Sequence, residues 1–168
     1  MKKIILLLFV SLFPLGIFAQ DFATSFINKH GDKDLEVVSI GKQMLSMLEE
    51  MSSNDPELKE VIHNLNGIKI MTSTSEESAQ KAFKEAYAML FKKNSGFEEM
   101  MSVKEENEET YIMIRKKGDV IKDLVLLTFG KEQFNMICLT GNINVDSLAK
   151  LSSVISLNKL KKLKPEED

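Results

Sequence analysis

Hydrophobic residues change their spacing along the chain, from a helical period in the first half to strand-like runs in the second. Apolar positions recur every three or four residues in segments over about 21–30, 39–52 and 75–93, which predicts amphipathic helices there. Two short strand-like patterns lie between these segments, at 35–39 and 68–71. The first half of the chain is therefore expected to be mostly helical.

Cap residues place further helices. Asp55 precedes Pro56, a pair typical of a helix start, and Gly67 is expected to end that helix. Thr74 and Glu77 have the spacing of a capping box at the start of the 75–93 helix. Asn144 is expected to cap a last helix whose apolar stripe comprises Leu148, Leu151 and Ile155.

After Gly96 the pattern changes to strands. Four strand-like segments, separated by short turn-like stretches, cover about 99–105, 110–116, 120–129 and 133–140. Short connections between successive strands favour antiparallel neighbours. The sequence therefore predicts a single α+β domain: an antiparallel four-stranded meander in the C-terminal half, packed with several amphipathic helices.

Two of these strands are apolar on both faces, at Leu124–Phe129 and Phe134–Leu139. A sheet with one solvated face would alternate apolar and polar residues instead. Either helices cover both faces of the sheet, or one face receives a ligand or a partner. The sequence leaves both explanations open.

The first residues have the pattern of a signal peptide. Lys2 and Lys3 precede an apolar run, Ile4–Phe13, that is shorter than the roughly 20 residues of a membrane-spanning helix. We expect cleavage after Ala19, with residues 1–19 as signal peptide, 20–158 as the domain and 159–168 as a charged tail. Because no cysteine lies near the cleavage point, a lipoprotein is not expected. The prediction is a periplasmic or secreted protein without a stable membrane anchor.

Charge and cysteine content exclude further classes of protein, namely nucleic-acid-binding proteins and disulfide-stabilised domains. The chain has 22 Lys and Arg against 25 Asp and Glu, a formal net charge of −3, and loses two lysines with its leader. Such an acidic balance argues against nucleic-acid binding, which depends on neutralising phosphates. A single cysteine, Cys138, cannot form an intramolecular disulfide and is expected to be a buried small hydrophobe.

Residues suited to catalysis or metal binding are scarce. The two histidines, His30 and His63, share no ligand spacing with each other or with Cys138, so no metal site is predicted. The paired acids, such as those in Glu105–Glu109, fit a solvated turn better than a catalytic pair. No phosphate-binding loop, dinucleotide fingerprint or nucleophile elbow is present. We therefore expect no enzyme activity and no cofactor.

Methionine is abundant, with ten residues in 168. Methionine fills irregular gaps in cores and also suits adaptable binding surfaces. Three methionines at helical spacing are the candidates for an apolar binding surface, a groove between their helix and the sheet: Met44, Met47 and Met51. Core filling is the alternative for the same three residues.

Several loose motifs along the chain resemble one family. They are Phe22-x3-Phe26, the stretch Leu35–Ile40 before a Met/Leu helix, Gly67–Ile70, and Leu139–Ile143 before Leu148-x2-Leu151. Together they are similar to the DUF4252 family of small exported Bacteroidetes proteins of unknown function. The resemblance implies no catalytic or ligand-binding residue, and it implies a link to an envelope response.

These observations favour a periplasmic, non-enzymatic interaction or sensing module whose partner is an envelope protein. The alternative is a carrier of a lipid or another apolar small molecule, which the methionines motivate. A carrier would need a closed, mostly apolar cavity of roughly several hundred Å³. The oligomeric state, the trigger and the identity of the partner stay open.

Overall fold

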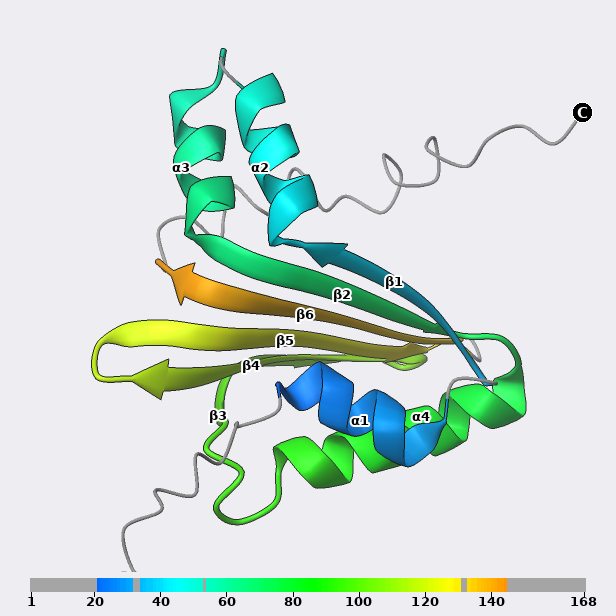
Figure 1. Ribbon diagram of the computed structural model, residues 1–168. Helices are drawn as coiled ribbons and strands as arrows, with labels where there is room; N and C mark the ends of the chain where they lie inside the picture. Colours follow the sequence, from blue (N-terminus) through cyan, green and yellow to red (C-terminus); the bar gives the residue numbers. More distant parts are fainter. Residues whose placement is uncertain (1–20, 32–33, 53, 131–132, 145–168) are drawn as a thin grey trace, which may run out of the picture.

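Four helices and six strands make up residues 21–31, 34–52, 54–130 and 133–144, the part of the chain that the computed structural model describes (Figure 1). In chain order they are α1 (Phe22–His30), β1 (Leu35–Gly41), α2 (Lys42–Met51), α3 (Pro56–Asn64), β2 (Leu65–Ser73), α4 (Glu76–Leu90), β3 (Glu98–Lys104), β4 (Glu108–Lys117), β5 (Val120–Gly130) and β6 (Gln133–Ile143). The predicted signal peptide, the helix expected after Asn144 and the charged tail lie outside the described residues.

All six strands form one sheet, in the order β1-β2-β6-β5-β4-β3. Every neighbouring pair is antiparallel. Short connections join β3 to β4 and β4 to β5, and β6 follows β5 closely in the chain, whereas the α2–α3 hairpin joins β1 to β2 (Figure 1). The sheet therefore combines chain segments from both halves of the sequence.

The predicted four-stranded sheet is wrong, although the α+β class is correct. The two short patterns near 35–39 and 68–71 are longer strands, which pair with each other, and β2 also pairs with β6. Local hydrophobic pattern shows that a segment is extended but not which distant strand it joins, so the sequence did not reveal this pairing. Gly67, predicted to end a helix, instead lies inside β2 because α3 already ends at Asn64.

The helix starts follow the local rules of capping. Asp21 caps α1 and Asp55 caps α3, each accepting a hydrogen bond from the backbone N–H three residues later. The capping box of α4 lies one residue later than predicted. Ser75 accepts from the N–H of Ser78 at 3.2 Å, and the Ser78 hydroxyl accepts from the N–H of Ser75 at 2.9 Å.

One face of the sheet, which we call the helix-covered face, is covered by α1 and α4 (Figure 1). The alanines Ala79, Ala82 and Ala86 let α4 approach closely, and Phe22 and Phe26 anchor α1. The buried side chains that the strands contribute to this face are Leu35, Met71, Tyr111, Met113, Val125, Leu127, Phe134, Met136 and Cys138.

The opposite face, which we call the aliphatic face, carries two apolar rows that run across the strands. The register aligns one residue from each of the six strands in the first row: Val38, Ile70, Ile137, Leu126, Ile112 and Met101. The second row comprises Ile40, Ile68, Leu139, Leu124 and Ile114. The α2–α3 hairpin packs against one end of this face through Leu45, Val61 and Ile62. The sheet therefore has a core on both sides.

Candidate functional site

The α2–α3 hairpin is the element that carries the predicted binding residues. It rises away from the ends of β1 and β2 (Figure 1). Leu45, which is buried, and Leu48, which is half-buried, turn toward the aliphatic core. The Lys42 ammonium donates to the carbonyl oxygens of His63 and Leu65, at 2.8 and 3.0 Å, and so ties the start of α2 to the end of α3.

Met44, Met47 and Met51 lie on the outer side of α2 and are 50, 60 and 78% exposed. Their spacing of three and four residues places them in one stripe, which we call the methionine face. Core filling is therefore wrong for these three residues. They also do not line a groove against the sheet, because Leu45 and Leu48 occupy that side. Binding through the methionine face stays a prediction.

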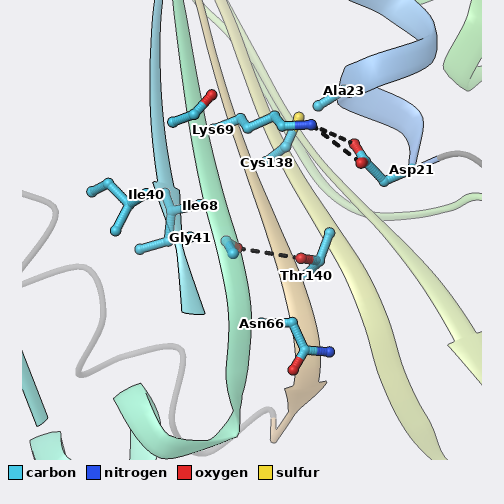
Figure 2. Close-up of a pocket in the computed structure, with 11 residues that line it drawn as sticks. Asp21, Ala23, Ile40, Gly41, Asn66, Ile68, Lys69, Cys138 and Thr140 are labelled. Atoms are coloured by element: carbon cyan, nitrogen blue, oxygen red, sulfur yellow. Dashed lines mark hydrogen bonds and ion pairs between the residues drawn. The ribbon is translucent and has the colours of Figure 1, made fainter. Parts of the chain in front are cut away.

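A pocket of about 220 Å³ lies between the start of α1 and strands β1, β2 and β6 (Figure 2). Its polar lining residues are Asp21, Ser39, Asn66, Lys69 and Thr140. The Lys69 ammonium reaches across the sheet to both Asp21 carboxylate oxygens, each at 3.2 Å, and also donates to the Thr24 hydroxyl. The Thr140 hydroxyl donates instead to the carbonyl oxygen of Gly67, at 3.4 Å. Asp21, Lys69 and Thr140 therefore each already have a partner within the protein.

The pKa shifts of the ionisable groups around this pocket do not favour nucleophilic chemistry at Cys138. Burial raises the pKa of the Cys138 thiol, and the nearby Asp21 carboxylate raises it further, which outweighs the opposing effect of Lys69. Cys138 is therefore a protonated, buried hydrophobe, as the sequence predicted, and not a nucleophile. Desolvation raises the pKa of Asp21, but hydrogen bonds from Thr24 and Lys69 outweigh it, so this pKa lies below its ordinary 3.8.

The size of the pocket also limits its use. Sites that enclose a drug-sized molecule hold roughly 300–1,000 Å³. At about 220 Å³ this pocket falls below that range. It is thus a poor match to the cavity that a lipid carrier would need.

His30 makes a contact that sequence reasoning missed. It ends α1, as predicted, but its side chain is buried, stacks on the Phe26 ring at 5.4 Å and lies 2.9 Å from the Glu85 carboxylate of α4. The spacing of 55 residues between the two partners leaves no local signal for this pair. His63, in contrast, is exposed and bonds Glu49 across the α2–α3 hairpin at 3.1 Å.

A second polar contact also escaped the sequence. The Arg115 guanidinium donates to the buried Asp123 carboxylate at 2.8 Å and lies over the Phe97 ring at 5.0 Å. An aspartate inside the apolar β5 segment was the signal that could have indicated a buried partner. Because Arg115 already neutralises Asp123, the pair fits a structural role.

Neither a metal-binding cluster nor a membrane-spanning helix is found in the described part of the chain. Residues 21–31, 34–52, 54–130 and 133–144 contain no group of three or more His, Cys, Asp and Glu side chains that could hold a metal ion. Within the same residues, no helix is both long and apolar enough to cross a bilayer.

Comparison with known proteins gives one match. The family model for DUF4252, a domain of unknown function, matches residues 28–151, most of the chain. The chain belongs to the DUF4252 family. No curated protein and no solved structure matches it. The match begins within α1 of this DUF4252 domain and continues past the end of β6. The family resemblance seen in the sequence motifs is thereby confirmed.

Proposed function

We propose that this DUF4252 protein is an exported, non-enzymatic interaction module that binds an envelope protein through its methionine face. The observation that carries the proposal is the exposure of Met44, Met47 and Met51, each half or more exposed, on one side of α2. Apolar side chains gathered in this way on a surface are a common mark of an interaction site.

The chemistry of methionine suits such a role. Its side chain is unbranched and polarisable, so it adapts to partners of differing shape. Burying one such side chain fully contributes about 1.5–3 kcal/mol. Because Leu45 and the Lys42 contacts hold the inner side of α2, the outer side can be covered without disturbing the fold. The partner that fits is a protein with an apolar groove that accepts one helix face.

Site-specific photo-crosslinking in cells of the source organism tests the proposal. A photoreactive phenylalanine analogue replaces Met47, and the matched control places the same analogue at Met101, which is 46% exposed on β3. We expect a discrete crosslinked protein from position 47 that is missing from position 101. Adding Met44→Gln and Met51→Gln to the position-47 protein should remove the crosslink without altering the thermal unfolding temperature.

Equal crosslinking from both positions, or none from position 47, would contradict the proposal. Native mass spectrometry of the same protein, released gently from the periplasm, distinguishes an interaction module from the main alternative, a carrier of a lipid or another apolar small molecule. A reproducible extra mass of lipid size would favour a carrier. A protein absent from the periplasm and the medium would contradict the exported location.

A further inference from the structure

Strand β3 forms one edge of the sheet, where its neighbour is β4. All seven residues of this strand are exposed, and the apolar side chains of Met100, Met101 and Val103 are 44, 46 and 41% exposed. An edge strand presents a row of backbone N–H and C=O groups with which another strand can pair. This edge therefore offers both hydrogen-bonding groups and apolar side chains to a further strand.

The charges of β3 decide what such a strand could be. Natural edge strands often avoid pairing through charged side chains or a β-bulge. β3 has a bulge at Met100, which the register with β4 skips, and its charged residues lie toward its two ends. Its central stretch, Met100–Val103, has no charge. The end charges therefore oppose or favour pairing according to the charges that they meet.

The register with β4 shows which β3 side chains share a face, because directly opposed residues lie on the same side of a sheet. Met101 and Val103 oppose β4 residues of the aliphatic face. The side chains that lie on the helix-covered face are Glu99, Ser102 and Lys104. In agreement, the Ser102 hydroxyl donates to the Glu99 carboxylate at 2.7 Å. The exposed apolar residues of β3 are thus on one face and an acid and a base on the other.

This arrangement is complementary to itself. A two-fold axis perpendicular to the sheet places β3 of a second copy antiparallel to β3 of the first, with the same faces aligned. When the axis passes through Ser102, Met101 of each copy opposes Val103 of the other, and Glu99 opposes Lys104. Apolar side chains then meet on the aliphatic face and opposite charges meet on the helix-covered face. Each contact occurs twice.

A shift of the axis by one residue removes this match. One residue earlier, Glu98 would oppose Val103, and one residue later, Glu105 would oppose Met101. With the axis at Ser102, Glu98 and Glu105 meet each other at the ends of the pairing. The Lys116 ammonium, 3.6 Å from the Glu98 carboxylate, reduces that repulsion.

The other edge strand, β1, does not have this pattern. Glu36 is its one charged residue, so pairing of β1 with its own copy would bring no opposite charges together. On β3, by contrast, the Lys104 side chain is 62% exposed and can reach an acid of a second copy.

We infer that β3 pairs antiparallel with β3 of a second copy of this chain, about a two-fold axis at Ser102, so that the two sheets become continuous. The methionine face stays free, because α2 contacts β1 and β2 at the other end of the sheet. A single strand pair is a small interface, and interfaces below about 1,200 Å² are typical of weak complexes. The dimer is therefore expected at high protein concentration.

Charge reversal tests the pairing by sedimentation velocity over a concentration series. Glu99→Lys and Lys104→Glu, each alone, should raise the dissociation constant of the dimer about tenfold or more, because like charges would face each other twice. An equal mixture of the two variants should recover the dimer, since positions 99 and 104 again carry opposite charges in the mixed pair. The matched control is Glu36→Lys, the same change on the exposed surface of β1, which should have no effect.

A disulfide tests the position of the axis. In an antiparallel pair, directly opposed residues have Cα atoms about 4.5–5.5 Å apart, which a disulfide can span. Ser102→Cys should therefore link two copies under mild oxidation, whereas Cys138 is buried and does not compete. Met101→Cys is the control, because the two positions 101 lie diagonally across the pair, about 7–8 Å apart, and should link far more slowly.

Several outcomes would overturn the inference. The wild-type chain could stay monomeric throughout the series, or the mixture of charge variants could associate no better than each variant alone. An equal effect of Glu36→Lys would assign the contact to the β1 edge. The photoreactive analogue at position 101 gives a further check: its product should join two copies of this chain. A product with a different protein, formed while the wild-type chain is monomeric, would assign the edge to a foreign strand.

Discussion

The two faces of the sheet bury apolar side chains in different ways. The helix-covered face combines aromatic and methionine side chains with the alanines of α4, so two helices lie close against it. The aliphatic face is built almost entirely from Ile, Leu and Val, and the described helices pack against one end of it. The apolar residues of β5 and β6 thus contribute to two surfaces, which differ in side-chain shape and in the helices that pack against them.

A polar row marks the limit of the aliphatic face. Next to the first apolar row lie Thr72, Asn135, Thr128 and Thr110, one on each of four neighbouring strands. The Thr72 hydroxyl donates to the Asn135 side-chain oxygen at 3.2 Å, and the hydroxyls of Thr110 and Thr128 lie 3.3 Å apart. These contacts satisfy polar groups at a border that no helix needs to cover.

The largest expected effect compares one residue from each face. Phe134→Ala removes a fully buried ring from beneath α1, where it stacks with Phe26, and should lower the free energy of unfolding by about 3–5 kcal/mol. Val38→Ala, at the open edge of the aliphatic face, should cost less than about 1 kcal/mol. Chemical denaturation measures both. Similar losses would mean that the β1 edge is buried as deeply as the helix-covered core.

A substitution at Gly141 tests the close contact between β6 and the junction of α3 with β2, where the α2–α3 hairpin joins the sheet. A β-carbon there would lie 2.2 Å from the carbonyl oxygen of Asn64 and 2.8 Å from the Cα of Leu65, at the junction of α3 and β2. Backbone cannot move aside cheaply, so Gly141→Ala should cost about 2–3 kcal/mol. Gly118→Ala is the control, because it has positive φ but open space, and should cost about 1 kcal/mol. Equal costs would show that the close approach relaxes easily.

The Arg115–Asp123 pair lies on the helix-covered side of the sheet and is expected to have an intermediate effect. Arg115→Met leaves the Asp123 carboxylate, only 7% exposed, without its partner and should cost about 1.5–3 kcal/mol. Adding Asp123→Asn should recover part of that loss, which a double-mutant cycle measures. Strict additivity of the two changes would contradict a direct interaction.

The smallest expected effect depends on pH. The pKa of Asp21 is lower in the folded protein than its ordinary 3.8, so its charged form stabilises the fold at neutral pH. That contribution is lost as pH falls below about 4 and the carboxylate is protonated. Asp21→Asn keeps the helix cap but loses the Lys69 ion pair, so it should cost under about 1 kcal/mol at pH 7 and less still near pH 3. A cost that does not change with pH would contradict the ionic contribution of Asp21.

Local rules predicted the elements of this fold better than their assembly. The Asp55–Pro56 helix start and the four strands of the second half were predicted, since caps and alternation depend on neighbouring residues. The pairing of β2 with β6 was not, because the backbone groups that join them are about seventy residues apart. The contact of His30 with Glu85, 55 residues away, was missed for the same reason. The Arg115–Asp123 pair is local in sequence but depends on the register of β4 against β5, which residue pattern does not give.

The candidate site shows the same division. Spacing alone identified Met44, Met47 and Met51 as one side of a helix. It did not show which side faces water, because the apolar stripe of α2 is wider than the surface that the hairpin can bury. Leu45 and Leu48 take the inner positions and leave the methionines outside.

By itself, the sequence determined the family, the α+β class, most helix and strand segments and the scarcity of catalytic chemistry, since each depends on residue type and short-range spacing. Only the tertiary structure decided that the sheet has six strands, that its two faces differ and that the methionines of α2 are exposed. These features depend on which distant segments meet, and hydrophobic burial, which drives that meeting, is non-directional and leaves no local mark in the chain.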